Sequence, residues 1–313
     1  MLHITCGDFA ADELRRAGVA DAALPWRDVL HEGPVPSDVT GREMREIRAD
    51  FIASCGWGAY GDVLESLDER DRLLEESGEQ GAALWFEADL YDQLQLLEVL
   101  SRLYGLGTAP ERVQLFGGAG FSGLGADDLR AGLAPVSAQT MRSAHEAWVA
   151  FCSPDPSGLA RVAAKGVAGL PFAGQALGRL LEEYPGMRDG LSRLERTMLQ
   201  AASSGAVSGA ELFKAVSRQE ERPFFGDWPC WLVASRLMSG PEPLLAGGEG
   251  TFPERTVRLT SAGERTLNGQ SDWMRAGGQG RWIGGVRLDG SHDWRYVPDS
   301  ETLTRLDGPG VIE

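Results

Sequence analysis

The sequence predicts an α/β domain at the N-terminus, then a helical segment, then a winged-helix-like C-terminal module. Short apolar runs alternate with amphipathic stretches through about residue 135, which indicates a small Rossmann-like parallel sheet with helices packed on it. From about Val136 the pattern becomes helical only, with proline-containing breaks. Beyond residue 209 the order helix, helix, strand, helix is typical of a winged helix.

The elements follow from periodicity and from start and stop signals. Gly18 ends the first helix in the expected way, and Asp8 stands at its start. In the first 135 residues we expect strands at 2–7, 22–26, 82–87 and 112–117, helices at 9–17, 42–54, 60–76 and 90–104, and loops at 27–36 and 117–125.

The second half contains fewer strand signals. We expect helices at 137–151, 156–165, 172–184, 191–204, 209–219, 227–238 and 261–269, a strand at 256–260, and a wing within 242–254. RWIGGVRL (281–288) and DWRYV (293–297) are expected to form a closing β-hairpin, joined by DGSH. The predicted domains are therefore 1–135, 136–205 and 206–313.

Composition excludes several classes of protein. The 313 residues, 42% of them hydrophobic, suffice for about two globular domains, and no apolar run is long enough to span a membrane. The N-terminus has no signal-peptide pattern, and four scattered cysteines predict neither a disulfide framework nor a structural zinc site. We therefore expect a cytoplasmic protein with no membrane partner.

The charge argues against nucleic acid as a partner. The net charge is −16, and residues 1–190 hold 30 acidic against 16 basic residues, whereas a phosphate-binding face must be basic. The predicted second helix of the winged-helix-like module, 227–238, offers only Arg236 and is otherwise mostly apolar. Packing or homo-oligomer formation through this module is the expected use.

The densest polar cluster follows the second predicted strand, where open α/β sheets bind their ligands. Arg27 is suited to hold an anion in a bidentate grip. Asp28, His31 and Glu32 are residue types used for acid–base catalysis or for binding a hard divalent cation. The alternative is structural: Arg27 and Asp28 form a buried pair that holds the loop, and Glu32 faces water.

A second cluster follows the third predicted strand. Asp89 stands where a helix cap belongs, and Asp92 and Gln93 lie one turn inside the helix, near a natural anion site. Asp89 is therefore either a cap or a ligand-binding residue, and Asp8 presents the same choice. Parallel pairing would bring Asp8, Asp28 and Asp89 to one edge of the sheet.

The glycine-rich loop does not predict a dinucleotide site. Gly118, Gly120 and Gly123 have the G-x-G-x-x-G spacing, but no acidic residue ends a second strand about 20 residues later. A loop over the same sheet edge is the expected structure, with Ser122 as a ligand contact. The sequence thus contains neither a strong nucleotide motif nor a strong metal motif, and it leaves the cofactor unknown.

Several segments resemble a bacterial family known as domain of unknown function 1835. The specific ones are PWRDVLHEGP and WFEADLYDQLQL; HITCGDFAADELRRAG, PFFGDWPCW, RLTSAGERTLNG, RWIGGVRL and WRYV also match, so the resemblance is nearly full length. It implies an N-terminal α/β domain followed by helical and winged-helix-like parts, and it brings no established activity. Such sequences often have G-D-S at the first turn, whereas this chain has Phe9 after Asp8 and thus no serine nucleophile there.

The leading functional hypothesis is an enzyme, or an enzyme-like binder, of a small anionic molecule. Arg27 would position the anion and His31 would act as general acid or base, while Asp28, Glu32 and Asp89 would orient the histidine or bind a divalent cation. One alternative is a non-catalytic regulator that senses a ligand and contacts a protein or DNA through the C-terminal module. Another is a scaffold whose polar motifs only fasten loops.

Overall fold

A computed structural model describes all residues except 78–79, 279, 290–292 and 307–313. The chain forms two compact units, and the division falls within one helix. Unit 1 comprises residues 1–177 together with 284–286, and unit 2 comprises 178–283 and 287–313. The expected helical segment 136–205 is thus shared between the two units. Within the described residues, no helix is long and apolar enough to cross a membrane.

Unit 1 is built on a mostly parallel five-stranded sheet, in agreement with the predicted α/β class. Its strands are β1 (Leu2–Thr5), β2 (Leu24–Pro25), β3 (Ala82–Trp85), β4 (Val113–Phe116) and β5 (Leu133–Pro135), in the order β2-β1-β3-β4-β5. β1 pairs in parallel with β2 and β3, and β3 pairs in parallel with β4. Only β5, which the sequence did not indicate, is antiparallel to its neighbour.

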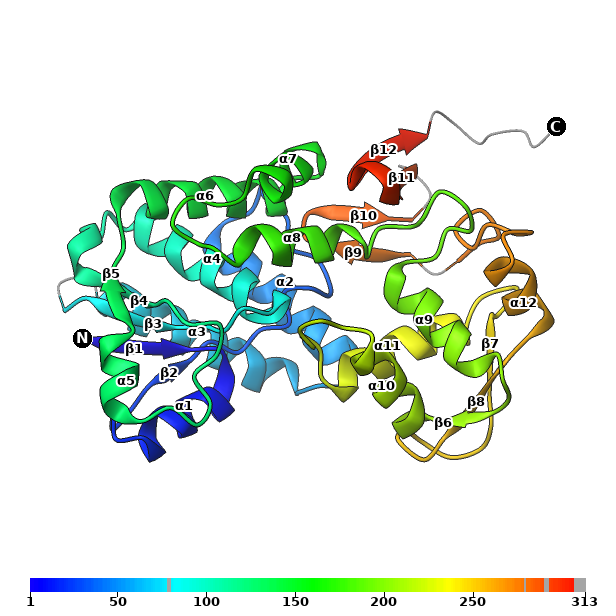
Figure 1. Cartoon of the computed structure of the whole chain (residues 1–313), viewed down its shortest axis with the longest axis horizontal. Helices are drawn as coiled ribbons and strands as arrows, with labels where there is room; N and C mark the ends of the chain where they lie inside the picture. Colours follow the sequence, from blue (N-terminus) through cyan, green and yellow to red (C-terminus); the bar gives the residue numbers. More distant parts are fainter. Residues whose placement is uncertain (78–79, 279, 290–292, 307–313) are drawn as a thin grey trace. The chain divides into compact units, whose positions relative to one another are not determined.

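The central strand, β3, is buried along its whole length, so a short apolar run in the sequence was enough to predict it. All four residues of β3, AALW, are buried, as expected for a parallel strand covered on both faces. Helices cover those two faces (Figure 1). Helices α1 and α5 lie on one face, where Leu14, Trp85 and Leu129 belong to a common apolar cluster. Helix α4 lies on the other face and packs against α6.

Apart from α5, for which the sequence analysis gave no bounds, the helices of unit 1 begin and end close to the predicted bounds. They are α1 (Gly7–Arg16), α2 (Gly41–Ser54), α3 (Tyr60–Glu76), α4 (Leu90–Gly105), α5 (Ala126–Ala131), α6 (Ala138–Cys152), α7 (Ser157–Lys165) and most of α8 (Ala173–Leu181), with a 3₁₀ turn at Pro110–Arg112. Thr40 and Glu43 form a capping box at α2, and Asp89 caps α4. Gly18 follows the end of α1 with a positive φ of 70°, as predicted.

A distant segment of the sequence belongs to unit 1. The amide of Gly285 donates to the carbonyl of Phe151, and the carbonyl of Gly284 accepts from the amide of Val35. A Cβ at residue 285 would stand 1.8 Å from the carbonyl oxygen of Cys152, so only glycine fits there. The paired glycines of RWIGGVRL therefore serve close backbone packing.

Unit 2 contains helices and small antiparallel sheets. Its elements are α9 (Arg193–Ala202), β6 (Val207–Ser208), α10 (Gly209–Arg218), α11 (Asp227–Leu237), β7 (Leu245–Gly247), β8 (Thr256–Leu259), α12 (Ser261–Leu267), β9 (Arg281–Ile283), β10 (Val286–Leu288, partly in unit 1), β11 (Asp293–Val297), a 3₁₀ turn (Pro298–Ser300) and β12 (Thr302–Leu306). Strands β6, β8 and β7 form a sheet in that order, with antiparallel neighbours.

The predicted closing hairpin is wrong. Segment 281–288 does not pair with 293–297; β9 pairs with β10 instead, and β11 pairs antiparallel with β12. The physical reason lies in two turns. Gly284 and Gly285 allow β9 to fold back on β10, and Glu301, at a positive φ of 51°, reverses the chain into β12. The predicted DGSH connection lies mostly outside the described residues.

Candidate functional site

The carboxyl ends of three adjacent parallel strands meet at one edge of unit 1. Cys6 follows β1, Trp26 follows β2 and Phe86 follows β3. The chain leaves β1 toward β2 on one side and reaches β3 on the other, so the strand order reverses between β1 and β3. Open α/β sheets bind ligands at such a reversal. The sequence prediction that these strand ends share an edge is confirmed.

Asp8 and Arg27 form an exposed ion pair at this edge. Nε of Arg27 donates to Oδ2 of Asp8 at 2.8 Å, and Nη2 donates to Oδ1 at 2.5 Å. The hydrogen bond from Arg27 lowers the pKa of Asp8. Asp8 is not the cap of α1, because the helix begins at Gly7 and Cys6 holds the N-cap position. Of the two choices for Asp8, capping is therefore wrong.

Asp28 has a different partner from the one the structural alternative named. Its carboxylate binds Arg48 of α2, with Nη2 donating to Oδ1 at 2.7 Å, and both side chains are 2% exposed. Arg48 also donates to the carbonyls of Val29, Glu32 and Pro34. One buried guanidinium thus holds the whole loop, and the loop-fastening role belongs to Asp28 with Arg48 rather than with Arg27.

A polar stripe on α4 holds the same loop from the other side. Gln95 Nε2 donates to the carbonyl of Asp28 at 2.8 Å, and Trp26 Nε1 donates to Glu98 Oε2 at 2.7 Å. The His31 ring meets the edge of Tyr91, with ring centroids 5.9 Å apart. The three α4 residues, Tyr91, Gln95 and Glu98, share one helix face by their spacing of four and three.

His31 and Glu32 are buried, at 9% and 6% exposure. The expectation that Glu32 faces water in the structural alternative is therefore wrong. The loop turns inward after Asp28, and the tight turn at Gly33 packs against the ring of Phe51. Both side chains are thus withdrawn from solvent, which limits direct contact with a ligand.

Carboxyl groups gather at the start of α4. Asp92 is 3% exposed, and its Oδ2 accepts from the Glu87 amide at 2.6 Å. Desolvation, followed by repulsion from Asp89, raises the pKa of Asp92 to about 8. Desolvation also raises the pKa of Asp89 to about 6, although Asp89 caps the helix by accepting from the Asp92 amide. Asp89 is thus a cap, and Asp92 holds its proton more tightly than an ordinary aspartate does.

The thiol of Cys6 borders this acidic cluster. Burial and the nearby Asp92, with which the thiol is hydrogen-bonded, raise the pKa of Cys6 far above its ordinary value. A thiol that keeps its proton is a poor nucleophile. Cys6 therefore adds a hydrogen-bonding group at the strand edge, and not a reactive thiolate.

The glycine-rich loop lies over the same edge. The Phe121 amide donates to Glu87 Oε1 at 3.0 Å, and the Ala88 amide donates to the carbonyl of Ala119. Gln93 supports Glu87 from inside, since its Nε2 donates to the Glu87 carbonyl at 2.6 Å. Ser122, the predicted contact residue, is exposed. The loop and the β3–α4 connection thus form one hydrogen-bonded structure.

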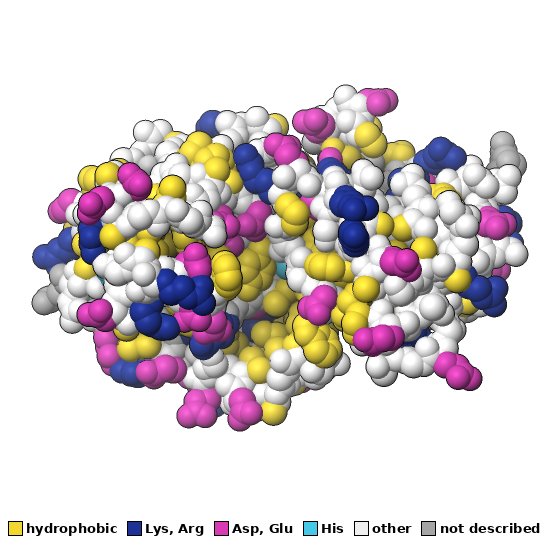
Figure 2. Space-filling view, turned by 60° about the horizontal axis from the view of Figure 1, so that its bottom comes forward, with side chains coloured by type: hydrophobic (Ala, Val, Ile, Leu, Met, Phe, Trp, Pro, Cys, Tyr) yellow, Lys and Arg dark blue, Asp and Glu magenta, His cyan; other side chains and the backbone are white. Residues whose placement is uncertain are grey.

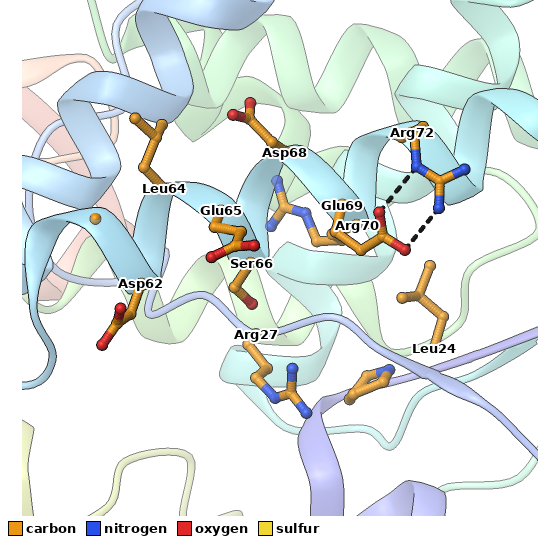
Figure 3. Close-up of a pocket in the computed structure, with 12 residues that line it drawn as sticks. Leu24, Arg27, Asp62, Leu64, Glu65, Ser66, Asp68, Glu69, Arg70 and Arg72 are labelled. Atoms are coloured by element: carbon orange, nitrogen blue, oxygen red, sulfur yellow. Dashed lines mark hydrogen bonds and ion pairs between the residues drawn. The ribbon is translucent and has the colours of Figure 1, made fainter.

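A groove of about 790 Å³ runs between β2 and α3 (Figure 3). Arg27 faces α3 across it, and Arg70 and Arg72 also line it. Arg72 pairs with Glu69, whereas Arg70 is buried, lies 4.0 Å above the Trp26 ring and pairs with Asp71. The remaining lining residues are Leu24, Pro25, Gly61, Asp62, Leu64, Glu65, Ser66, Asp68 and Glu69. The groove therefore has charges of both signs.

The donors expected to bind a cation do not converge. In the part of the chain that the structure describes, no three His, Cys, Asp or Glu side chains form a group able to hold a metal ion. Asp28 is committed to Arg48, and Asp89 to its helix.

Sequence reasoning missed Arg48, Arg70 and Glu98. Each lies inside a helical segment and looks like an ordinary charged surface residue. The one available signal is position: a charged residue on the apolar face of a predicted helix needs a buried partner.

Searches of protein-family models and of curated proteins find no match to this chain.

Removing Arg48 should destabilise the protein strongly. Arg48→Ala leaves the Asp28 carboxylate and three carbonyls without their donor, which should lower the free energy of unfolding by about 3–5 kcal/mol. Urea denaturation followed by tryptophan fluorescence measures this. Arg42→Ala, on the same helix but in an exposed pair with Glu46, is the matched control and should leave the midpoint unchanged. Equal midpoints for the two variants would contradict the role of Arg48.

Asp92 should make the protein less stable as the pH rises. Its pKa is higher in the folded state, so the folded state binds more protons between about pH 4 and pH 8, and stability falls across that range. Asp92→Asn should flatten this decline and unfold at a higher temperature than the native protein at pH 9. Thermal unfolding from pH 4 to pH 9 tests this, with the fully exposed Asp127→Asn as control. A decline of unchanged slope in Asp92→Asn would refute it.

Proposed function

We propose that unit 1 binds a small anionic molecule at the carboxyl edge of its sheet, as an enzyme or enzyme-like binder. The observation that carries this is the bidentate Asp8–Arg27 pair. A carboxylate or phosphate presents the same two acceptor oxygens to a guanidinium. Asp8 thus stands in for the anionic group of a ligand.

Exchange of Asp8 for a ligand anion costs little. The side chains of Arg27 and Asp8 are 54% and 66% exposed, and exposed pairs are worth only about 0–1 kcal/mol. The α1 N-terminus beside Arg27 also favours an anion, because its first amides lack partners within the helix.

Asp92 would set the charge behind this edge in the proposal. It is 3% exposed, as withdrawn from solvent as His31 and Glu32, and its pKa is raised to about 8, so it would add less negative charge near an incoming anion than an ordinary aspartate does. Asp92 lies at the strand reversal, beside Cys6. Cys6 precedes Asp8 by two residues in the sequence. His31, the acid or base predicted from sequence, and Glu32 would act behind the loop as positioning residues. Asp28 holds the loop, and a divalent cation has no assigned ligands.

We also propose that the chain belongs to the domain of unknown function 1835 family and resides in the cytoplasm. The two specific motifs of that resemblance, PWRDVLHEGP and WFEADLYDQLQL, supply the loop and the α4 start that form the site. Among the described residues no disulfide joins any of the four cysteines, which suits a reducing compartment.

Removing Arg27 and removing the charge of Asp8 should change the affinity for an anion in opposite directions. Arg27→Ala should weaken binding of inorganic phosphate or pyrophosphate at least tenfold, because the bidentate donor is lost. Asp8→Asn should strengthen it by up to about fivefold, because the competing carboxylate is gone. Calorimetric titration at low salt measures both. The control is Arg15→Ala, which removes an exposed ion pair with Asp12 on α1, the helix that also carries Asp8. Phosphate affinity that is insensitive to both changes would end the proposal.

A second candidate function rests on the strand order in unit 2. Helix α9, strand β6, helices α10 and α11, and strands β7 and β8 follow one another as in a winged helix, and the order β6-β8-β7 supports that arrangement. We propose that such a module contacts a protein rather than DNA. Most of α11 is buried, and at its N-terminus Trp228 is 59% exposed. Basic and acidic side chains are interspersed on the face in Figure 2.

This candidate predicts no DNA binding. The protein should not shift a mixed-sequence duplex in a gel at about 20 mM salt, where phosphate contacts are strongest. A salt-sensitive shift that Arg258→Ala reduces would instead indicate a DNA-binding wing. A variant on an exposed arginine of unit 1, Arg42→Ala, serves as the control for non-specific charge effects.

A further inference from the structure

Unit 1 contains a second, chemically different cavity of about 280 Å³. It lies between the β4–β5 edge of the sheet, the N-terminal halves of α4 and α6, and the segment 169–172. Its most buried walls are apolar side chains, namely Phe86, Leu96, Phe116, Val136 and Leu170. The rim is exposed at Ala134, Pro135, Ser137 and Pro171, so the cavity opens to solvent.

Among the residues that the structure describes, none that lines this cavity is charged. The polar side chains present already have partners: Ser137 Oγ lies 2.8 Å from Thr140 Oγ1, and Gln93 Nε2 donates to Glu87. A charged ligand would lose its hydration here without gaining a counterion. The lining therefore selects a neutral molecule, in contrast to the groove that contains Arg27.

The volume sets the size of that molecule. Protein interiors contain few voids larger than a water molecule, and an apolar cavity of about 150 Å³ is enough to bind benzene. A cavity of about 280 Å³ therefore has room for a substituted or two-ring aromatic group. Phe86, Phe116 and Phe172 line it and supply aromatic surface for such a group.

We propose that this cavity is a binding site for a neutral, ring-sized apolar molecule, separate from the anion site. It goes beyond the proposed function, because neither Arg27 nor Asp8 lines it. Gln93 connects the two sites physically: it lines the cavity and hydrogen-bonds the carbonyl of Glu87, whose carboxylate holds the glycine-rich loop.

Indole is a suitable probe, and benzoate is its charged counterpart of similar size. Saturation-transfer NMR and calorimetry on the full-length protein should show indole binding with a Kd on the order of 0.1–1 mM, and benzoate binding at least tenfold weaker. The methyl resonances of Leu96, Val136 and Leu170 should shift with indole. Absence of saturation transfer to indole, or equal binding of benzoate, would overturn the proposal.

Ala134→Phe should block the cavity. Ala134 pairs with Leu115 across β4 and β5, and both residues line the cavity. Because Ala134 is exposed, the larger ring removes no buried contact, and indole affinity should fall at least tenfold. Ala131→Phe, at an exposed alanine of α5 outside the cavity, is the matched control. Unchanged indole affinity in Ala134→Phe would overturn the proposal, and the methyl shifts decide the matter if that variant does not fold.

The two sites are separable by experiment. Arg27→Ala should leave indole affinity unchanged, and Ala134→Phe should leave phosphate affinity unchanged. Failure of phosphate binding alone would refute the anion site and not the cavity. Loss of indole binding in Arg27→Ala would overturn the claim of a separate site.

Discussion

The candidate anion site depends on the buried pair between Asp28 and Arg48. This pair pulls Asp28 inward, and the hydrogen bond to Glu98 pulls Trp26 inward on the other side of Arg27. Arg27 lies between two anchored neighbours, and its side chain remains exposed at the sheet edge. Breaking a buried pair leaves an uncompensated charge in the interior, so the loop has little freedom to rearrange.

On the opposite side of the same sheet edge, two largely buried carboxyl groups repel each other. Burial of Asp92 close to Asp89 raises both pKa values, so the folded protein holds a proton there that an unfolded chain would release. Such groups cost stability near neutral pH, and they cluster at functional sites. The α4 N-terminus and the Glu87 amide offset part of this cost. This edge therefore has an exposed guanidinium on one side and largely buried carboxyl groups of raised pKa on the other.

Most elements of unit 1 could be predicted, because their signals are local. The apolar run in β3, the capping box at Thr40 and the glycine after α1 each determine structure within a few residues. The missed strands β5, β6 and β12 lack such signals and exist through pairing with a partner strand. The hairpin error has the same origin: the pairing of 293–297 depends on which strand the turns bring beside it.

The features of the candidate site can be separated in the same way, into local ones and ones that depend on distant residues. The sequence by itself determined that Arg27, Asp28, Asp89 and Asp92 follow parallel strands, because strand ends and helix starts are local features. Only the tertiary structure decided their partners: Asp28 bonds to Arg48, twenty residues away, and Arg27 to Asp8. It also decided which carboxyl groups lose water and which cavity remains unfilled. The physical reason is that charge pairing, desolvation and packing are set by residues distant in sequence, whereas capping and periodicity are set by neighbours.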